Sequence, residues 1–190
     1  MASVFDVLGH DHVEVKRMLT ELQKGPTTTS GASDEALALR KKMVEQLVIE
    51  ESKHEALEEM YFWPTVRGAL ADGDRLADTA TGQEQEAKHV LDRLDKLDAG
   101  NPEFEQLVGA FIQAGREHID YEEGQVWPSL RDALTAEQAN ELGDRIEAGK
   151  STAPTRPHPH TPPSPGVLKT AGPAVAAADR ARDAATGRGE

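Results

Sequence analysis

Residues 54–70, HEALEEMYFWPTVRGAL, and residues 118–134, HIDYEEGQVWPSLRDAL, decide the fold of this chain. Aligned without a gap, the two segments are identical at eight of seventeen positions, and both tryptophans of the protein lie in the match. Each copy begins with His-x-x-x-Glu. Because residues four apart lie on one face of a helix, each copy predicts a helix that presents an imidazole and a carboxylate side by side. We expect the two helices to be one unit used twice, related by a pseudo-two-fold axis.

Helical patterns extend on both sides of these copies. The chain predicts four long helices: one from Ser3 to Gly25, one over 34–63, one over 83–97 and one over 102–127. Pro64 and Pro128 are expected to end or kink the second and fourth helices, because proline removes a backbone donor and clashes with the preceding turn. A shorter fifth helix over 135–149 opens with a capping box of Thr135 and Gln138. Long helices with short connections predict an all-α, up-down-up-down four-helix bundle.

Residues 150–190 differ in composition from the rest of the chain. This segment is rich in proline and alanine, and it cannot bury enough apolar surface to offset the entropy of ordering. We therefore predict a bundle domain over 1–149 and a disordered tail over 150–190, with at most a transient helix over 174–185. His158 and His160 in the tail are expected to be solvated.

Charge and composition exclude several classes of protein. The net charge is −13, and residues 150–190 carry six Lys or Arg against three Asp or Glu, so about −16 falls on residues 1–149. So acidic a body repels phosphate backbones and argues against nucleic acid as a partner. The absence of cysteine excludes disulfides and thiolate metal sites. Without an apolar run that could span a membrane or serve as a leader, we expect a soluble cytoplasmic protein, a monomer or a weak homodimer.

Histidines and glutamates on the inward faces indicate a metal site. His12 stands on the apolar stripe of the first helix, His54 with Glu58 and His118 with Glu122 stand on the second and fourth, and His89 lies on the third. Imidazole suits iron, copper, zinc and nickel, and a bridging carboxylate suits a metal pair. Without metal these groups would be buried polar atoms with poor partners. On the third helix the apolar face centres on Val90, Leu94 and Leu97, to the side of His89, which leaves Glu86 open as a substitute or companion.

The pattern His…His-x-x-x-Glu…His…His-x-x-x-Glu, spread over residues 3–145, resembles the hemerythrin-like, or HHE, cation-binding family. The resemblance implies two iron ions joined by an oxo or hydroxo bridge. By position, one iron would be held by His12 and His54 and the other by His89 and His118. Glu58 and Glu122 would bridge the two ions.

The sequence departs from the oxygen-carrying hemerythrins in two places. Their third helix has a second histidine one turn from the first, whereas Gln85 and Arg93 lie four residues on either side of His89 here. Their last helix carries His-x-x-x-x-Asp, whereas this chain has His118-x-x-x-Glu122. Tyr61, three residues after Glu58, is predicted to fill the gap as a phenolate ligand with a catalytic role; Tyr121 is the alternative.

Two further predictions follow from the same helices. Trp63 and Trp127 fall opposite the histidines and are expected to be packing residues. A ferritin-like di-iron carboxylate protein would need Glu-x-x-His on two helices, and Glu51-x-x-His54 and Glu86-x-x-His89 would provide it. The fourth helix lacks that motif, and His12 and His118 would have no purpose, so hemerythrin is favoured.

The function predicted from this resemblance is catalase-like decomposition of hydrogen peroxide in oxidative or nitrosative stress. The missing histidine, the candidate Tyr61 and the similarity to actinobacterial hemerythrin-like proteins motivate it. The alternatives are reversible binding or sensing of O2 or NO without turnover, and iron holding.

Overall fold

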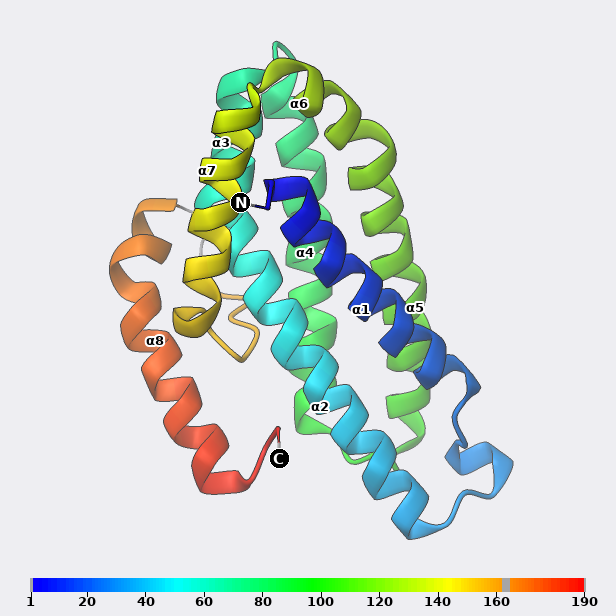
Figure 1. Cartoon of the computed structure of the whole chain (residues 1–190). Coiled ribbons are helices and arrows are strands. Elements are labelled where there is room, and N and C mark those ends of the chain that lie inside the picture. The colour runs from blue at the N-terminus through cyan, green and yellow to red at the C-terminus, as the bar shows by residue number, and fades with distance from the viewer. Residues whose placement is uncertain (1, 162–164, 190) are drawn as a thin grey trace.

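Four long helices form an antiparallel bundle in the computed structural model, which describes residues 2–161 and 165–189 (Figure 1). They are α1 (Val4–Lys24), α2 (Asp34–Leu57), α4 (Gly73–Lys96) and α5 (Pro102–Tyr121), and a 3-10 turn, η1 (Thr28–Ser30), lies between the first two. Each long helix packs against the next, and α5 returns to pack against α1. The predicted all-α, up-down-up-down bundle is confirmed, and the described residues contain no strand.

Local chemistry explains where these helices begin. The Ser3 hydroxyl accepts a hydrogen bond from the backbone N–H of Asp6, and the backbone N–H of Ser3 donates to the Asp6 carboxylate, which completes a capping box. Asn101 caps α5 in front of Pro102. The third long helix begins at Gly73, ten residues before the predicted start at Gln83. A Cβ on Gly73 would lie 2.2 Å from the carbonyl oxygen of Val66, so only glycine lets the chain turn this tightly into α4.

Both copies of the repeat contain a π-helical turn, and the helices continue through their prolines. The turns are η2 (Glu58–Phe62) and η3 (Glu122–Val126), followed by α3 (Trp63–Ala69) and α6 (Trp127–Ala133). In each copy the backbone N–H of the tryptophan donates to the backbone carbonyl of the glutamate five residues earlier, Trp63 to Glu58 and Trp127 to Glu122. Of the two outcomes expected at Pro64 and Pro128, an end or a kink, the end is wrong, because the wider turn ahead of each proline leads into a further helix. The extra residue in the turn also rotates every later side chain relative to an uninterrupted α-helix.

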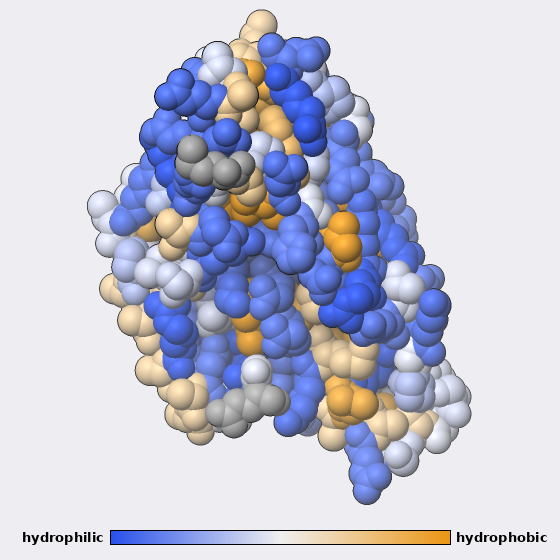
Figure 2. Space-filling model, in the orientation of Figure 1, coloured by the Kyte–Doolittle hydropathy of each residue, from blue (hydrophilic) through white to orange (hydrophobic). Residues whose placement is uncertain are grey.

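Two apolar clusters fill the bundle and leave a polar layer between them. One cluster lies at the end formed by α3, α6 and the start of α1, and includes Leu8, Leu57 and Phe62. The other lies toward the opposite end and includes Leu19, Val44 and Leu91. On the face drawn in Figure 2, hydrophobic residues show only as separate patches among hydrophilic ones. The layer between the clusters is therefore the place for the predicted polar site.

The tail is folded against the bundle where the structure describes it, which corrects the prediction of disorder. After α7 (Ala136–Gly149) and η4 (Lys150–Thr152), the chain forms α8 (Pro165–Thr186), which runs along the outside of the bundle (Figure 1). Ala153, Leu168 and Ala176 are buried. Residues 162–164 and 190 of the predicted tail lie outside the described residues.

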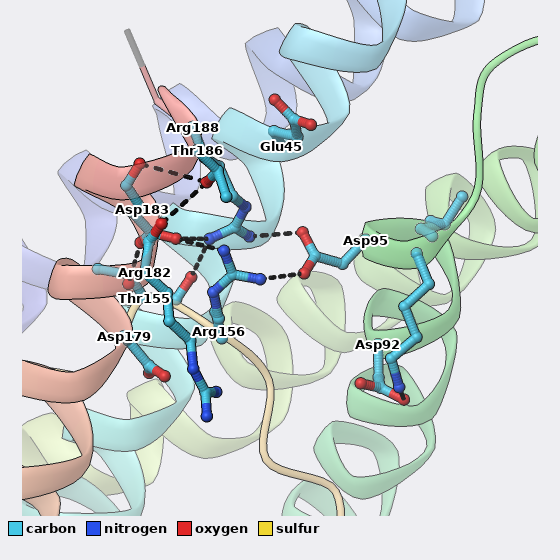
Figure 3. A network of polar contacts seen from close by, with 12 residues as sticks. Glu45, Asp92, Asp95, Thr155, Arg156, Asp179, Arg182, Asp183, Thr186 and Arg188 are labelled. Atoms are coloured by element: carbon cyan, nitrogen blue, oxygen red, sulfur yellow. Dashed lines mark hydrogen bonds and ion pairs between the residues drawn. The ribbon is translucent and has the colours of Figure 1, made fainter.

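Ion pairs fasten this tail to α4 (Figure 3). The carboxylate of Asp95 on α4 pairs with Arg156 at 2.8 Å and with Arg188 at 2.9 Å. Both arginines also pair with Asp183 of α8, at 2.7 and 3.0 Å. Composition alone could not predict this network, because it depends on pairing residues far apart in the chain. Among the described residues, none of the helices has the length and apolar character that crossing a membrane requires.

Candidate metal centre

Six side chains from the four long helices and their π turns converge between the two apolar clusters. They form two groups of possible metal ligands: His12, His54, Glu58 and Glu122 in one, and Glu58, Glu84, His118 and Glu122 in the other. Within each group the ligand atoms lie within 4.8 Å of one another. Glu58 and Glu122 belong to both groups. The arrangement therefore offers two neighbouring cation positions bridged by two carboxylates.

The imidazole Nε2 atoms face the shared carboxylates. His12 Nε2 lies 3.1 Å from Glu122 Oε2, and His118 Nε2 lies 3.4 Å from Glu122 Oε1. His54 Nε2 lies 3.3 Å from Glu58 Oε1. The two His-x-x-x-Glu motifs thus bring together the groups predicted from the repeat, and His12 joins them from α1.

The opposite ring nitrogen of each histidine faces an acceptor. The Nδ1 atom of His12 lies 2.9 Å from Glu123, and that of His118 lies 3.0 Å from the side-chain oxygen of Gln83. The Nδ1 atom of His54 lies 3.6 Å from Asp11. The hydrogen-bonded partners of His12 and His118 fix each ring with its proton on Nδ1 and leave Nε2 free to bind a metal, whereas the contact of His54 with Asp11 is longer than a hydrogen bond.

Unpaired buried atoms support a cation at this place. The inward-facing Nε2 atoms of His12 and His118, both carboxylate oxygens of Glu58 and of Glu122, and one oxygen of Glu84 are buried without a hydrogen-bond partner. Leaving one such atom unpaired costs about 1–3 kcal/mol, and more when it is charged. Cations placed among these atoms would satisfy them together, so the donor set fits two metal ions.

The pKa values of these groups also show that the metal-free site lacks positive charge. Burial and the facing Glu122 raise the pKa of Glu58 to about 7. Burial, together with Glu58, raises the pKa of Glu84 well above its usual range. Although burial alone would raise it, the facing His118 and His12 hold the pKa of Glu122 below its ordinary value. Burial lowers the pKa of His118. The site thus retains protons on carboxylates where a metal ion would otherwise supply the positive charge.

The stability of the metal-free protein should consequently fall as pH rises from about 4.5 to 7. In this window the folded state holds a proton on Glu58 that the unfolded state has released, because the folded pKa is the higher one. This difference amounts to up to about 3 kcal/mol. His118, whose pKa is lowered, acts in the opposite direction below its ordinary value of 6.5. Urea unfolding in the presence of a chelator at several pH values measures the slope.

The variant Glu58→Gln is the control for this prediction, since it removes one titrating group and should make the slope shallower; Glu84, whose pKa is also raised, keeps part of it. Metal-loaded protein should show the reverse trend, because protons compete with metal for the same ligands. A metal-free stability that rises through this window in the wild type, or a slope unaltered in Glu58→Gln, would contradict the assignment of Glu58.

The structure does not bring His89 to the cluster. The side chain that α4 contributes is Glu84, where the sequence predicted His89. His89 is exposed, with its ring 6.0 Å from that of His160 in the tail. Glu84 is 1% exposed. The signal for Glu84 was present in the sequence: Leu76, Ala77 and Ala80 begin a buried stripe that passes through Glu84 to Leu91. A helix that begins only at Gln83, as predicted, lacks the first three residues of this stripe.

The other candidate ligands also lie away from the cluster. Tyr61 is half-buried, and its ring faces Lys169 of α8 with Nζ 5.0 Å from the ring centre. The π turn accounts for this position, because residue 61 no longer returns to the face of Glu58. Tyr121 donates to the carbonyl oxygen of Leu76 at 3.2 Å. Glu86 is exposed.

Both tryptophans contact candidate ligands, which corrects the prediction that they only pack on the opposite side. The indole N–H of Trp63 donates to Glu84 Oε1 and leaves the other oxygen free. Trp127, its equivalent in the repeat, stacks on the ring of His12 with ring centres 5.0 Å apart. The two tryptophans therefore position corresponding ligands, one on α4 and one on α1. Glu84 in one group thus corresponds to His12 in the other, so the two groups of candidate ligands differ in the type of one ligand.

Comparison with known proteins agrees with this site. Residues 3–130 match the family model described as the Hemerythrin HHE cation binding domain. The fold and the site define this chain as an antiparallel helical bundle with a central cluster of histidines and glutamates that could hold metal cations. The chain belongs to the hemerythrin HHE cation-binding domain family.

Individual relatives are distant. An uncharacterised hemerythrin-like protein of Schizosaccharomyces pombe is 26% identical over 96% of this chain and 86% of its own length. A DNA nickase of a Nostoc species is 24% identical over 78% of this chain, which spans only 39% of that protein. The crystal structure of a hemerythrin HHE cation binding domain-containing protein from Mycobacterium kansasii covers 94% of this chain and 99% of its own, with a TM-score of 0.66 and 21% identity. That likeness concerns the fold.

Proposed function

We propose that this chain binds two iron ions in its bundle and decomposes hydrogen peroxide in a catalase-like reaction. The observation that carries the proposal is the donor set of three imidazoles and three carboxylates, two of which are shared between the positions. Imidazole and carboxylate are both ligands of non-haem iron. Four protein ligands at each position leave coordination positions for a small molecule. Glu84 makes the set more anionic than four histidines would, which favours ferric iron and turnover over reversible binding of O2.

The chain also supplies groups that hold protons beside the site. When bound, an iron pair supplies two electrons by changing between its ferrous and ferric states. Two molecules of hydrogen peroxide then give one O2 and two water molecules. Cleavage of one peroxide to two water molecules takes up the two protons that the other releases as it becomes O2. Glu51 and Glu55 line the cavity next to His54, and burial raises the pKa of both carboxyl groups. Each therefore retains a proton at higher pH than an ordinary glutamate and can donate it to a departing oxygen.

Iron content and oxygen release test the proposal. Full-length protein supplied with ferrous iron should contain two irons per chain by elemental analysis, and an oxygen electrode should record one O2 for every two peroxides consumed. Iron-loaded protein that releases no O2 would overturn the catalase-like assignment. A coloured oxygen adduct that bleaches reversibly on deoxygenation would instead support the binding or sensing alternative.

A further inference from the structure

A groove leads from the candidate metal centre to the surface between α4 and α5. Its inner end is lined by four of the six candidate ligands, His12, His54, Glu84 and His118. The groove residues with exposed side chains, Glu86, Ala110, Ala114 and Glu117, all belong to α4 and α5, so the opening lies between these helices. We call this space the α4–α5 groove.

The α4–α5 groove is larger than hydrogen peroxide requires. Its volume is about 340 Å³. A water molecule occupies roughly 30 Å³ in the liquid, and hydrogen peroxide is smaller than two water molecules. Cavities that bind small organic ligands have volumes of roughly 300–1,000 Å³. The space beside the metal ligands is therefore sufficient for an organic group.

The walls beyond the metal ligands are largely apolar. Val90 lines the groove from α4, and Phe111 and Ala114 line it from α5. Contact with these side chains would remove a hydrocarbon group of a ligand from water and so favour its binding, whereas hydrogen peroxide has no apolar group to bury there. A ligand matched to both ends of the groove has a metal-binding polar head and a compact apolar substituent.

The rim of the groove selects against anions. Glu86 and Glu117 stand exposed at the opening, one on each helix. Both belong to the acidic body of the protein, so a carboxylate or phosphate that approached would be repelled. A neutral ligand meets no such barrier.

We infer that the α4–α5 groove binds a neutral organic hydroperoxide, with its O–O group toward the metal ions and its apolar substituent against Val90, Phe111 and Ala114. This inference rests on the proposed function for the peroxide head, and on the groove for the substituent. Reduction of such a hydroperoxide would break its O–O bond and take up two protons to yield the alcohol and water; two ferrous ions, held by the two groups of candidate ligands, would supply the two electrons.

Cumyl alcohol, the product alcohol of cumene hydroperoxide, tests the groove without any redox reaction. We expect calorimetric titration into iron-loaded, full-length protein to show saturable binding of one molecule per chain. The variant Ala114→Leu narrows the groove and should weaken this binding at least tenfold while two irons remain by elemental analysis. Gln106→Leu adds the same side chain to an exposed position of α5 outside the groove and should leave binding unchanged.

The outcomes separate this inference from the proposed function. Oxygen release from hydrogen peroxide without saturable binding of cumyl alcohol would overturn the inference alone. Binding of the alcohol by iron-loaded protein that releases no oxygen would overturn the catalase-like function and uphold the groove as an apolar binding site. Equal weakening by Ala114→Leu and Gln106→Leu, or tighter binding of benzoate than of the alcohol, would also overturn the inference.

Discussion

Replacement of Glu122 by alanine is expected to remove both metal ions from the protein, whereas His12→Ala should remove only one. Glu122 belongs to both groups of ligands, and so does Glu58, while His12 belongs to a single group. Deleting a shared carboxylate takes a ligand and a negative charge from both positions at once. Deleting His12 leaves the group of Glu58, Glu84, His118 and Glu122 complete.

Elemental analysis of purified variants measures this difference directly. Glu58→Ala should behave as Glu122→Ala does, and His118→Ala should lose the cation opposite to the one lost in His12→Ala. The control is Glu117→Ala, which removes a carboxylate from the same helix but from an exposed position, and should retain both ions. Two ions per chain in Glu122→Ala would show that the carboxylate does not bridge.

Deletion of residues 153–190 is expected to lower the melting temperature substantially. The deletion removes the buried side chain of Leu168 and the ion pairs of Arg156 and Arg188 with Asp95, which is itself 11% exposed. Burying one leucine contributes about 1.5–3 kcal/mol, and hydrogen bonds to charged groups add about 1.5–3 kcal/mol each. A net loss of roughly 3 kcal/mol corresponds to about 6–12 °C for a chain of this size.

Single substitutions on α4 identify how the tail is held. Asp95→Asn should lower the melting temperature in the same direction as the deletion, because two arginines lose their shared partner (Figure 3). Asp92→Asn, three residues earlier, disrupts only an exposed pair with Lys96 and should change the melting temperature little. Limited proteolysis should cut the tail faster in Asp95→Asn than in Asp92→Asn. An unchanged melting temperature after the deletion would contradict this prediction and indicate that the tail is disordered, as its composition predicts.

The repeat made the bundle and most of the candidate ligands predictable from sequence. Identical His-x-x-x-Glu segments locate two helices and one face of each, and His12 interrupts an otherwise apolar stripe on a third. These patterns depend only on the period of the α-helix. They can therefore be recognised without any knowledge of how the helices pack. The structure brings together the five ligands predicted in this way, His12, His54, Glu58, His118 and Glu122.

The ligand on the third helix and the role of Tyr61 were not predictable in the same way. The choice between His89 and Glu84 depends on where α4 begins, and the start at Gly73 is fixed by its close approach to Val66. The direction of Tyr61 depends on the π turn, which no periodic pattern signals. The folding of the tail depends on charges from separate segments that meet only in three dimensions.

The π turns bear on the history of the chain. Each copy of the repeat contains such a turn over the same five positions, directly ahead of the Trp-Pro pair. π turns are rare and usually occur singly inside α-helices, so two of them at matching positions of a repeat point to a common origin. The simplest order of events places the π turn in a single ancestral helical hairpin, before it was duplicated. On this view the two halves of the bundle are copies of one helical hairpin, each of which supplies one shared carboxylate, Glu58 or Glu122, to the candidate metal centre.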